Sequence, residues 1–158
     1  MRYSIGVILV LVIFFVPQAF AEKAPDFTLS GTTGKVHLSA LKGRVVYVDF
    51  WASWCVPCRK SFPWMNEIQS RFGAKGLTVV AINIDKGEGA AEAFLKDYPP
   101  IFKVAFNPSG DVAESYGVWT MPSSYLIDKK GNLRFIHKGF FDEGKDTIVT
   151  EIQELLVK

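Results

Sequence analysis

Continuous apolar runs and amphipathic segments alternate along the chain. The runs at 44–50 and 77–84 are rich in β-branched residues, which predicts strands that are buried on both faces. Apolar residues recur at helical spacing over 58–72 and again over 148–156, which predicts helices with one buried face. The centre of the chain therefore follows a β-α-β pattern, and its C-terminal part ends in a helix.

Shorter segments complete this order. Alternating residues on both sides of a glycine-bounded turn at 31–34 predict an N-terminal β-hairpin, and Lys129-Lys130-Gly131 predicts a second hairpin turn. The remaining predicted elements are a turn at 38–43, a helix at 90–98, a strand at 102–106, a short helix at 111–116, and strands at 124–128 and 132–138. This order predicts an α/β fold, with a mixed central sheet flanked by helices and an added N-terminal β-hairpin.

The first residues have the features of a targeting segment. Arg2 precedes an apolar run over 5–16, Pro17 interrupts it, and Ala19-Phe20-Ala21 supplies a small-x-small cleavage pattern. We therefore expect a signal peptide at 1–21, one domain at 22–158 and a periplasmic or other extracytoplasmic location. An uncleaved membrane anchor is the alternative, although the run is shorter than the roughly 20 apolar residues of a membrane span.

Composition sets the class of protein and removes one class of partner. The 158 residues are 49% hydrophobic and 22% charged, which is typical of a globular domain. The net charge of +2 and the absence of a Lys/Arg-rich run give no electrostatic basis for binding nucleic acid. We expect a monomer that acts on other proteins.

The two cysteines, Cys55 and Cys58, are the strongest chemical signal. They lie where the first central strand gives way to a helix. Unpaired amides and the helix dipole favour a thiolate at such a position, and the thiolate is the nucleophile of thiol–disulfide exchange. The pair therefore predicts a redox dithiol.

Two other roles for the cysteines remain open at this point. A structural zinc site needs four ligands, and His37 and His137 lack the paired spacing of zinc motifs. A purely structural disulfide would close a very short loop and so stabilise little. We expect neither a metal nor a cofactor.

The chain resembles thioredoxin-like proteins, and most closely the exported thiol–disulfide reductases of the TlpA and ResA type. Four segments carry the resemblance: 24–29, the active-site sequence 50–59, the approach to a cis-proline loop at 116–122, and the hairpin at 125–131. The resemblance implies that Cys55 attacks the substrate and that Cys58 resolves the mixed disulfide.

The resemblance also gives Asp49 a role as the buried acid beneath the dithiol. Burial in an apolar strand raises the pKa of an unpaired carboxyl, so Asp49 is expected to accept a proton from Cys58. A structural Asp with a hydrogen-bond partner is the alternative. Thioredoxin pairs its buried acid with a lysine, whereas Ala81 stands at that position here. Without this cation, the pKa of Asp49 should be higher still.

Substrate contacts are expected from residues around the dithiol. Pro57 matches the family's proline between the cysteines, and Trp54 is expected to pack beside them. Pro122 should be cis, which would present the backbone of Met121 to an extended substrate segment. Trp119 is either part of this groove or a plain surface aromatic.

These features favour an exported disulfide reductase. The resemblance implies reduction by a membrane thiol-electron transporter, with oxidised exported proteins or apocytochrome c as substrates. A disulfide oxidase or isomerase is the main alternative, since the same dithiol serves both. Peroxide reduction is disfavoured because Val48 and Ala52 stand where peroxiredoxins have Pro and Thr or Ser. A non-enzymatic adaptor would not need an intact cysteine pair.

Overall fold

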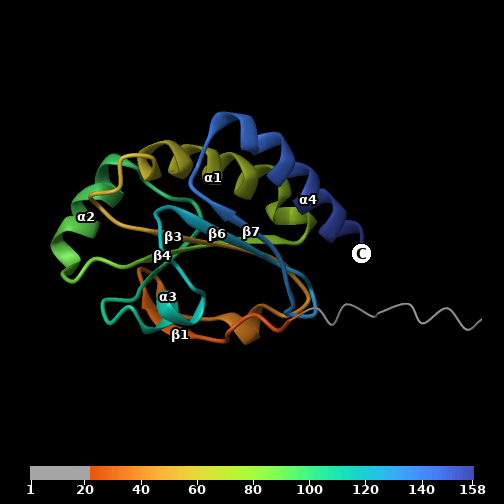
Figure 1. Ribbon diagram of the computed structural model, residues 1–158, viewed down its shortest axis with the longest axis horizontal. Coiled ribbons are helices and arrows are strands. Elements are labelled where there is room, and N and C mark those ends of the chain that lie inside the picture. Colours follow the sequence, from red (N-terminus) through yellow and green to blue (C-terminus); the bar gives the residue numbers. More distant parts are fainter. Residues whose placement is uncertain (1–21) are drawn as a thin grey trace, which may run out of the picture.

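The computed structural model describes residues 22–158 and arranges them around one mixed sheet (Figure 1). Its strands are β1 (Thr28–Gly31), β2 (Gly34–His37), β3 (Val45–Trp51), β4 (Leu77–Asn83), β5 (Lys103–Phe106), β6 (Ser123–Ile127) and β7 (Leu133–Lys138). The order across the seven-stranded sheet is β2-β1-β5-β4-β3-β6-β7. Strands β3, β4 and β5 are parallel, and β6 pairs antiparallel with both β3 and β7.

Helices cover both faces of this sheet. They are α1 (Cys58–Phe72), α2 (Glu88–Asp97), α3 (Asp111–Ser115) and α4 (Lys145–Val157), with short 3₁₀ turns η1 (Leu38–Leu41), η2 (Gly73–Lys75) and η3 (Asp142–Gly144). Helices α1, α2 and α4 lie on one face and α3 on the other (Figure 1). The sheet therefore separates two apolar clusters.

The predicted element order and fold class are confirmed. The β1–β2 hairpin forms at the predicted turn, and β1 also pairs with β5 at the edge of the parallel strands. The 38–43 segment, expected as a turn, begins with η1. The predicted signal peptide at 1–21 lies outside the described residues. No helix within 22–158 is long and apolar enough to cross a membrane.

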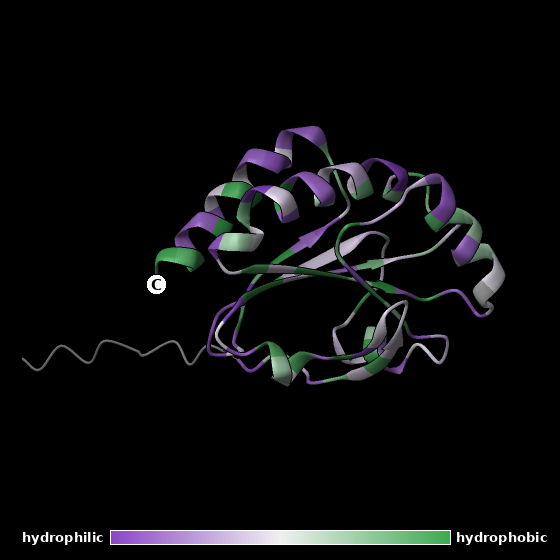
Figure 2. Ribbon diagram, turned by 180° about the vertical axis from the view of Figure 1, so that it is seen from behind, coloured by the Kyte–Doolittle hydropathy of each residue, from purple (hydrophilic) through white to green (hydrophobic). Residues whose placement is uncertain are grey.

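The pleat of β3 distributes its side chains between the two clusters. The cluster under α1, α2 and α4 includes Val45, Tyr47 and Trp51, and the cluster beside α3 includes Val46, Val48 and Phe50. Asp49 shares the face of Tyr47 and Trp51 because alternate residues of a strand point the same way. The covering helices alternate hydrophilic and apolar segments, as expected for helices with one buried face (Figure 2).

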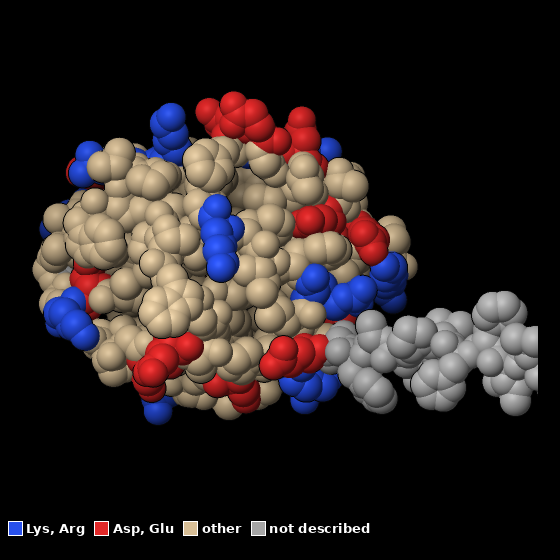
Figure 3. Space-filling view, viewed as in Figure 1, with Lys and Arg blue, Asp and Glu red and all other residues tan. Residues whose placement is uncertain are grey.

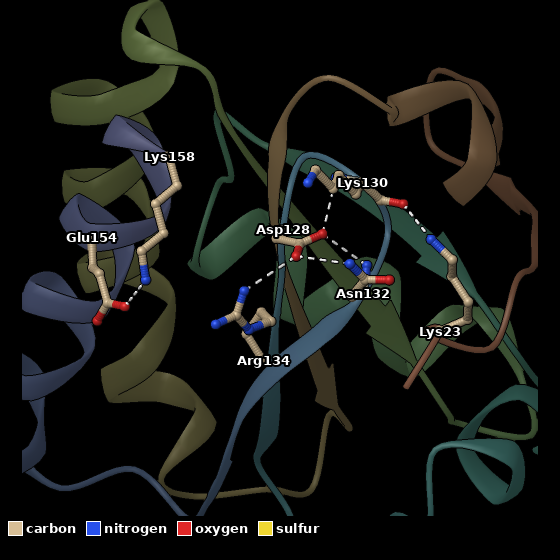
Figure 4. A network of polar contacts seen from close by, with 7 residues as sticks. All are labelled: Lys23, Asp128, Lys130, Asn132, Arg134, Glu154 and Lys158. Carbon is tan, nitrogen blue, oxygen red and sulfur yellow. Dashed lines mark hydrogen bonds and ion pairs between the residues drawn. The ribbon is translucent and has the colours of Figure 1, made fainter. Parts of the chain in front are cut away.

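A polar network organises the turn between β6 and β7 (Figure 4). The Asp128 carboxylate accepts hydrogen bonds from the backbone amides of Lys130 and Asn132, both at 2.9 Å, and from the Asn132 side chain at 3.0 Å. The Arg134 guanidinium lies 3.4 Å away. Burial alone would raise the pKa of Asp128, but these hydrogen bonds outweigh it and lower the pKa.

Charges on the visible face are mixed in sign. Figure 3 shows acidic and basic side chains interspersed, mainly toward the rim of this face, with uncharged residues between them. This face therefore carries no extended patch of one sign, in keeping with the small net charge of +2.

Candidate active site

The two cysteines lie at the junction between β3 and α1, as the sequence predicts. They form a disulfide, and the backbone N–H of Cys58 donates to the Cys55 sulfur at 3.3 Å. Cys58 is the first residue of α1, so this amide is one of the donors that helix geometry leaves without a backbone partner. After reduction, the same amide and the helix dipole would favour a thiolate on Cys55.

Polar side chains at the end of β4 hold the loop that precedes Cys55. The Asp85 carboxylate accepts the Ser53 backbone N–H and the Asn83 side-chain amide, both at 2.9 Å. The Asp85 backbone N–H in turn donates to the Asn83 side chain at 3.0 Å. These contacts were not predicted from the sequence. The sequence shows only that two polar residues, Asn83 and Asp85, come at the end of an apolar strand. This pattern does not indicate which residues they contact.

A groove of about 580 Å³ opens beside the disulfide. Its lining residues are Trp54, Cys55, Val56, Pro57, Ile84, Val118, Trp119, Thr120 and Met121. Cys55 reaches this groove and Cys58 does not. Trp54 is 66% exposed and Trp119 is 90% exposed, so both can contact an incoming chain. Trp51 instead packs in the core against Phe62 and Phe94.

The loop opposite the cysteines has the predicted backbone. The Met121–Pro122 peptide bond is cis, which confirms that prediction. Met121 lines the groove, whereas Pro122 is buried behind it and its carbonyl accepts the Gly139 N–H at 2.8 Å. Strand β6 begins directly afterwards at Ser123. The structure thus brings Trp54, Pro57 and Met121 to one groove, with Pro122 supporting its wall.

Asp49 lies in the core on the sheet face that α1 covers. It is 1% exposed, and its Oδ2 atom has no hydrogen-bond partner. Its register partner on β4 is Ala81, the residue that was expected to stand in place of the lysine of thioredoxin. Burial raises the pKa of Asp49 well above its ordinary value, in the predicted direction. Such a carboxyl keeps its proton to higher pH than an ordinary aspartic acid.

The described residues 22–158 contain no group of three or more His, Cys, Asp or Glu side chains arranged for a metal. The two histidines have polar partners elsewhere. His37 shares a hydrogen bond of 2.6 Å with Thr28 on the N-terminal hairpin, and His137 lies 2.8 Å from the Glu151 carboxylate.

Residues 20–136 match the model of the AhpC/TSA family, which covers most of the chain. The chain belongs to the AhpC/TSA family. It is 37% identical over 113 residues to the thiol-disulfide oxidoreductase ResA of Bacillus thuringiensis subsp. konkukian, covering 71% of this chain and 65% of that protein. It is 36% identical to ResA of Bacillus subtilis over 121 residues, covering 76% and 68% of the two chains. The match thus spans about two thirds of the length of these curated relatives.

Solved structures agree on the fold of this AhpC/TSA family member. A candidate thiol:disulfide interchange protein DsbE from Chlorobium tepidum superposes with a TM-score of 0.84 at 50% identity, covering 86% of this chain and 96% of that one. A candidate protein disulfide isomerase from Bacteroides thetaiotaomicron gives a TM-score of 0.80 at 29% identity, covering 87% and 90%. The architecture is a thioredoxin fold, and the bonded cysteine pair lies where β3 gives way to α1.

Proposed function

We propose that the protein is an extracytoplasmic thiol-disulfide oxidoreductase that works as a disulfide reductase. The observation that carries this proposal is the unequal placement of the two cysteines. Cys55 is 3% exposed and lines the groove, whereas Cys58 is completely buried and does not line it. Such an arrangement separates the attacking sulfur from the resolving one.

The chemistry follows from this placement. The Cys55 thiolate attacks a disulfide in the substrate, forms a mixed disulfide and releases one substrate thiolate. Asp49 accepts the proton of the Cys58 thiol. The Cys58 thiolate then attacks the Cys55 sulfur, which releases the second substrate thiolate and restores the Cys55–Cys58 disulfide. Two electrons pass to the substrate, and Asp49 returns its proton to solvent or to the product.

The groove supports a protein substrate. Its aromatic and aliphatic rim includes Trp54, Val56 and Trp119, all largely exposed. The Met121 backbone borders the same groove, where an extended segment could pair with it. We propose oxidised cysteines of exported proteins as the substrate class, including the haem-site thiols of apocytochrome c, and a membrane thiol-electron transporter as the reductant. Residues 1–21 would act as the signal peptide.

Peroxide reduction finds less support. The position three residues before Cys55 holds Ala52, which is fully buried and has no hydroxyl to contact a peroxide. The main alternative function is that of a disulfide oxidase or isomerase, because such an enzyme would use the same two sulfur atoms. The reduction potential separates these directions.

Equilibration of the protein with a dithiol buffer would measure that potential. A value near that of thioredoxin, about −270 mV, is expected for a reductase, and a value near about −120 mV would overturn this direction. Cys58→Ala should trap mixed disulfides through Cys55, whereas Cys55→Ala should trap none. Apocytochrome adducts would support a role in cytochrome maturation, and a broad set of adducts would count against a dedicated substrate.

A further inference from the structure

A polar row crosses the sheet from Asp49 to its edge. Ser124 on β6 is the register partner of Asp49, and His137 on β7 is the register partner of Ser124. Side chains directly opposite on neighbouring strands share a face and lie about 5 Å apart at Cβ. Glu151 of α4 completes the row from the helix that covers this face.

Two side-chain contacts lie at the outer end of the row. The Ser124 hydroxyl lies 3.5 Å from His137 Nδ1, and His137 Nε2 lies 2.8 Å from the Glu151 carboxylate. Asp49 and Ser124 are buried, whereas the side chains of His137 and Glu151 are 20% and 17% exposed. The row therefore runs by strand register from a buried acid to two side chains that are partly exposed.

The apolar cluster on this face contains further titratable side chains. Strand β3 contributes Tyr47 beside Asp49, and α1 contributes Cys58; β4 presents Ala81 opposite Asp49. The pKa of Tyr47 is raised, mainly by burial, next by the charge of Asp49 and more weakly by that of Glu151. A hydrogen bond with Ser124 lowers this pKa but does not outweigh the other causes. Tyr47 thus lies within electrostatic reach of both carboxyls.

We propose that His137 and Glu151 are positioning residues that set the protonation of Asp49 through Ser124. The proposal rests on the role given to Asp49 in the proposed function. The fold supplies no lysine on β4 for Asp49, so His137 is the group of the polar row that can carry a positive charge. The Glu151 carboxylate, 2.8 Å from His137 Nε2, balances the charge of this imidazole, and Ser124 lies between His137 and Asp49 in the strand register.

The two partners should act with opposite sign. Glu151→Gln removes a negative charge and leaves the imidazole, which favours ionised Asp49 and lowers its titration midpoint. His137→Gln leaves the Glu151 carboxylate unbalanced, which disfavours ionised Asp49 and raises the midpoint. Two strand spacings separate β3 from β7, about 10 Å. At an effective dielectric constant of about 20, a charge at this distance shifts a midpoint by up to about one pH unit.

The experiment follows the Asp49 side-chain carboxyl by ¹³C NMR as a function of pH in the oxidised protein. The expected result is a lower midpoint in Glu151→Gln, a higher one in His137→Gln, and a near-native midpoint in the double variant. Glu154→Gln is the matched control on α4, because Glu154 pairs with Lys158 at the exposed end of the helix. It should leave the midpoint unchanged.

The proposal is overturned if both variants leave the midpoint unchanged, or shift it in the same direction, while lowering the melting temperature. Either result would give the pair a purely structural role. If His137→Gln does not fold, Glu151→Gln alone decides, and an unchanged or raised midpoint in that variant overturns the proposal. The titration uses the oxidised protein and needs no substrate. A protein that reduces no disulfide would therefore refute the proposed function and leave this result standing.

Discussion

The buried carboxyl of Asp49 makes the free energy of unfolding depend on pH in an unusual direction. Most acidic groups stabilise a fold more when ionised, but burial raises the pKa of Asp49 in the folded state. The unfolded chain therefore releases this proton at lower pH than the folded one. Stability linked to Asp49 is complete below its unfolded pKa of about 3.9 and is lost as pH rises toward the folded pKa. Asp49→Asn removes this dependence.

The size of the effect follows from proton linkage. Within the window between the unfolded and folded pKa values, the native protein should lose about 1.4 kcal/mol per pH unit relative to Asp49→Asn. The amide introduces an offset, because Asp49 Oδ2 has no hydrogen-bond partner and the added amide donors need partners too. That offset does not vary with pH. The slope is therefore the quantity to interpret.

Urea unfolding of both proteins at half-unit steps from pH 4 to 7.5 measures this slope. The proteins should be kept oxidised so that the cysteines do not titrate. The expected result is a difference in unfolding free energy that increasingly favours Asp49→Asn as pH rises. A difference that stays constant from pH 4 to 7.5 would refute the raised pKa, and with it the role of Asp49 as proton acceptor at neutral pH.

Three further predictions concern other regions. Asp128→Asn should change the pH dependence of stability in the opposite direction to Asp49→Asn, because the pKa of Asp128 is lowered in the folded protein. The stabilisation from Asp128 is present above about pH 4 and is lost as pH falls through the folded pKa. The variant should therefore be less stable by about 1–2 kcal/mol at pH 7, with a smaller deficit in acid, as measured by urea unfolding. Phe62→Ala should cost about 3–5 kcal/mol by the same measurement, because Phe62 is fully buried against Trp51, Phe94 and Phe102; a loss under 1 kcal/mol would contradict this packing. Trp119→Ala should change the free energy of unfolding by less than about 0.5 kcal/mol. It should slow the reduction of a protein disulfide more than the reduction of a small-molecule disulfide. Equal effects on the two substrates would show that Trp119 does not contact the protein substrate.

Much of the fold and the reactive pair could be predicted from local sequence. Buried strands such as β3 and β4 are continuous apolar runs, and α1 shows helical periodicity from its first residue, so the strand-to-helix junction at Cys55 and Cys58 is visible in the sequence. The resemblance to thioredoxin-like proteins added the cis bond before Pro122 and the burial of Asp49. Both expectations agree with the structure.

Contacts between distant segments could not be predicted in this way. Nothing local to Asp85 indicates that its carboxylate holds the loop before Cys55, and nothing local to Ile84 or Val118 places them in the groove. Nothing local to His137 connects it with Asp49 either. Its alignment with Ser124 and Asp49 depends on the pairing of β7 with β6 and of β6 with β3.

The sequence by itself thus determined the element order and the cysteine pair at the strand-to-helix junction. These properties depend on residue type and on spacing along the chain. Only the tertiary structure decided which sulfur faces the groove and which residues form the polar row from Asp49 to Glu151. The physical reason is that strand register and helix packing bring together side chains far apart in sequence, and the electrostatic environment of a buried carboxyl is set by such neighbours.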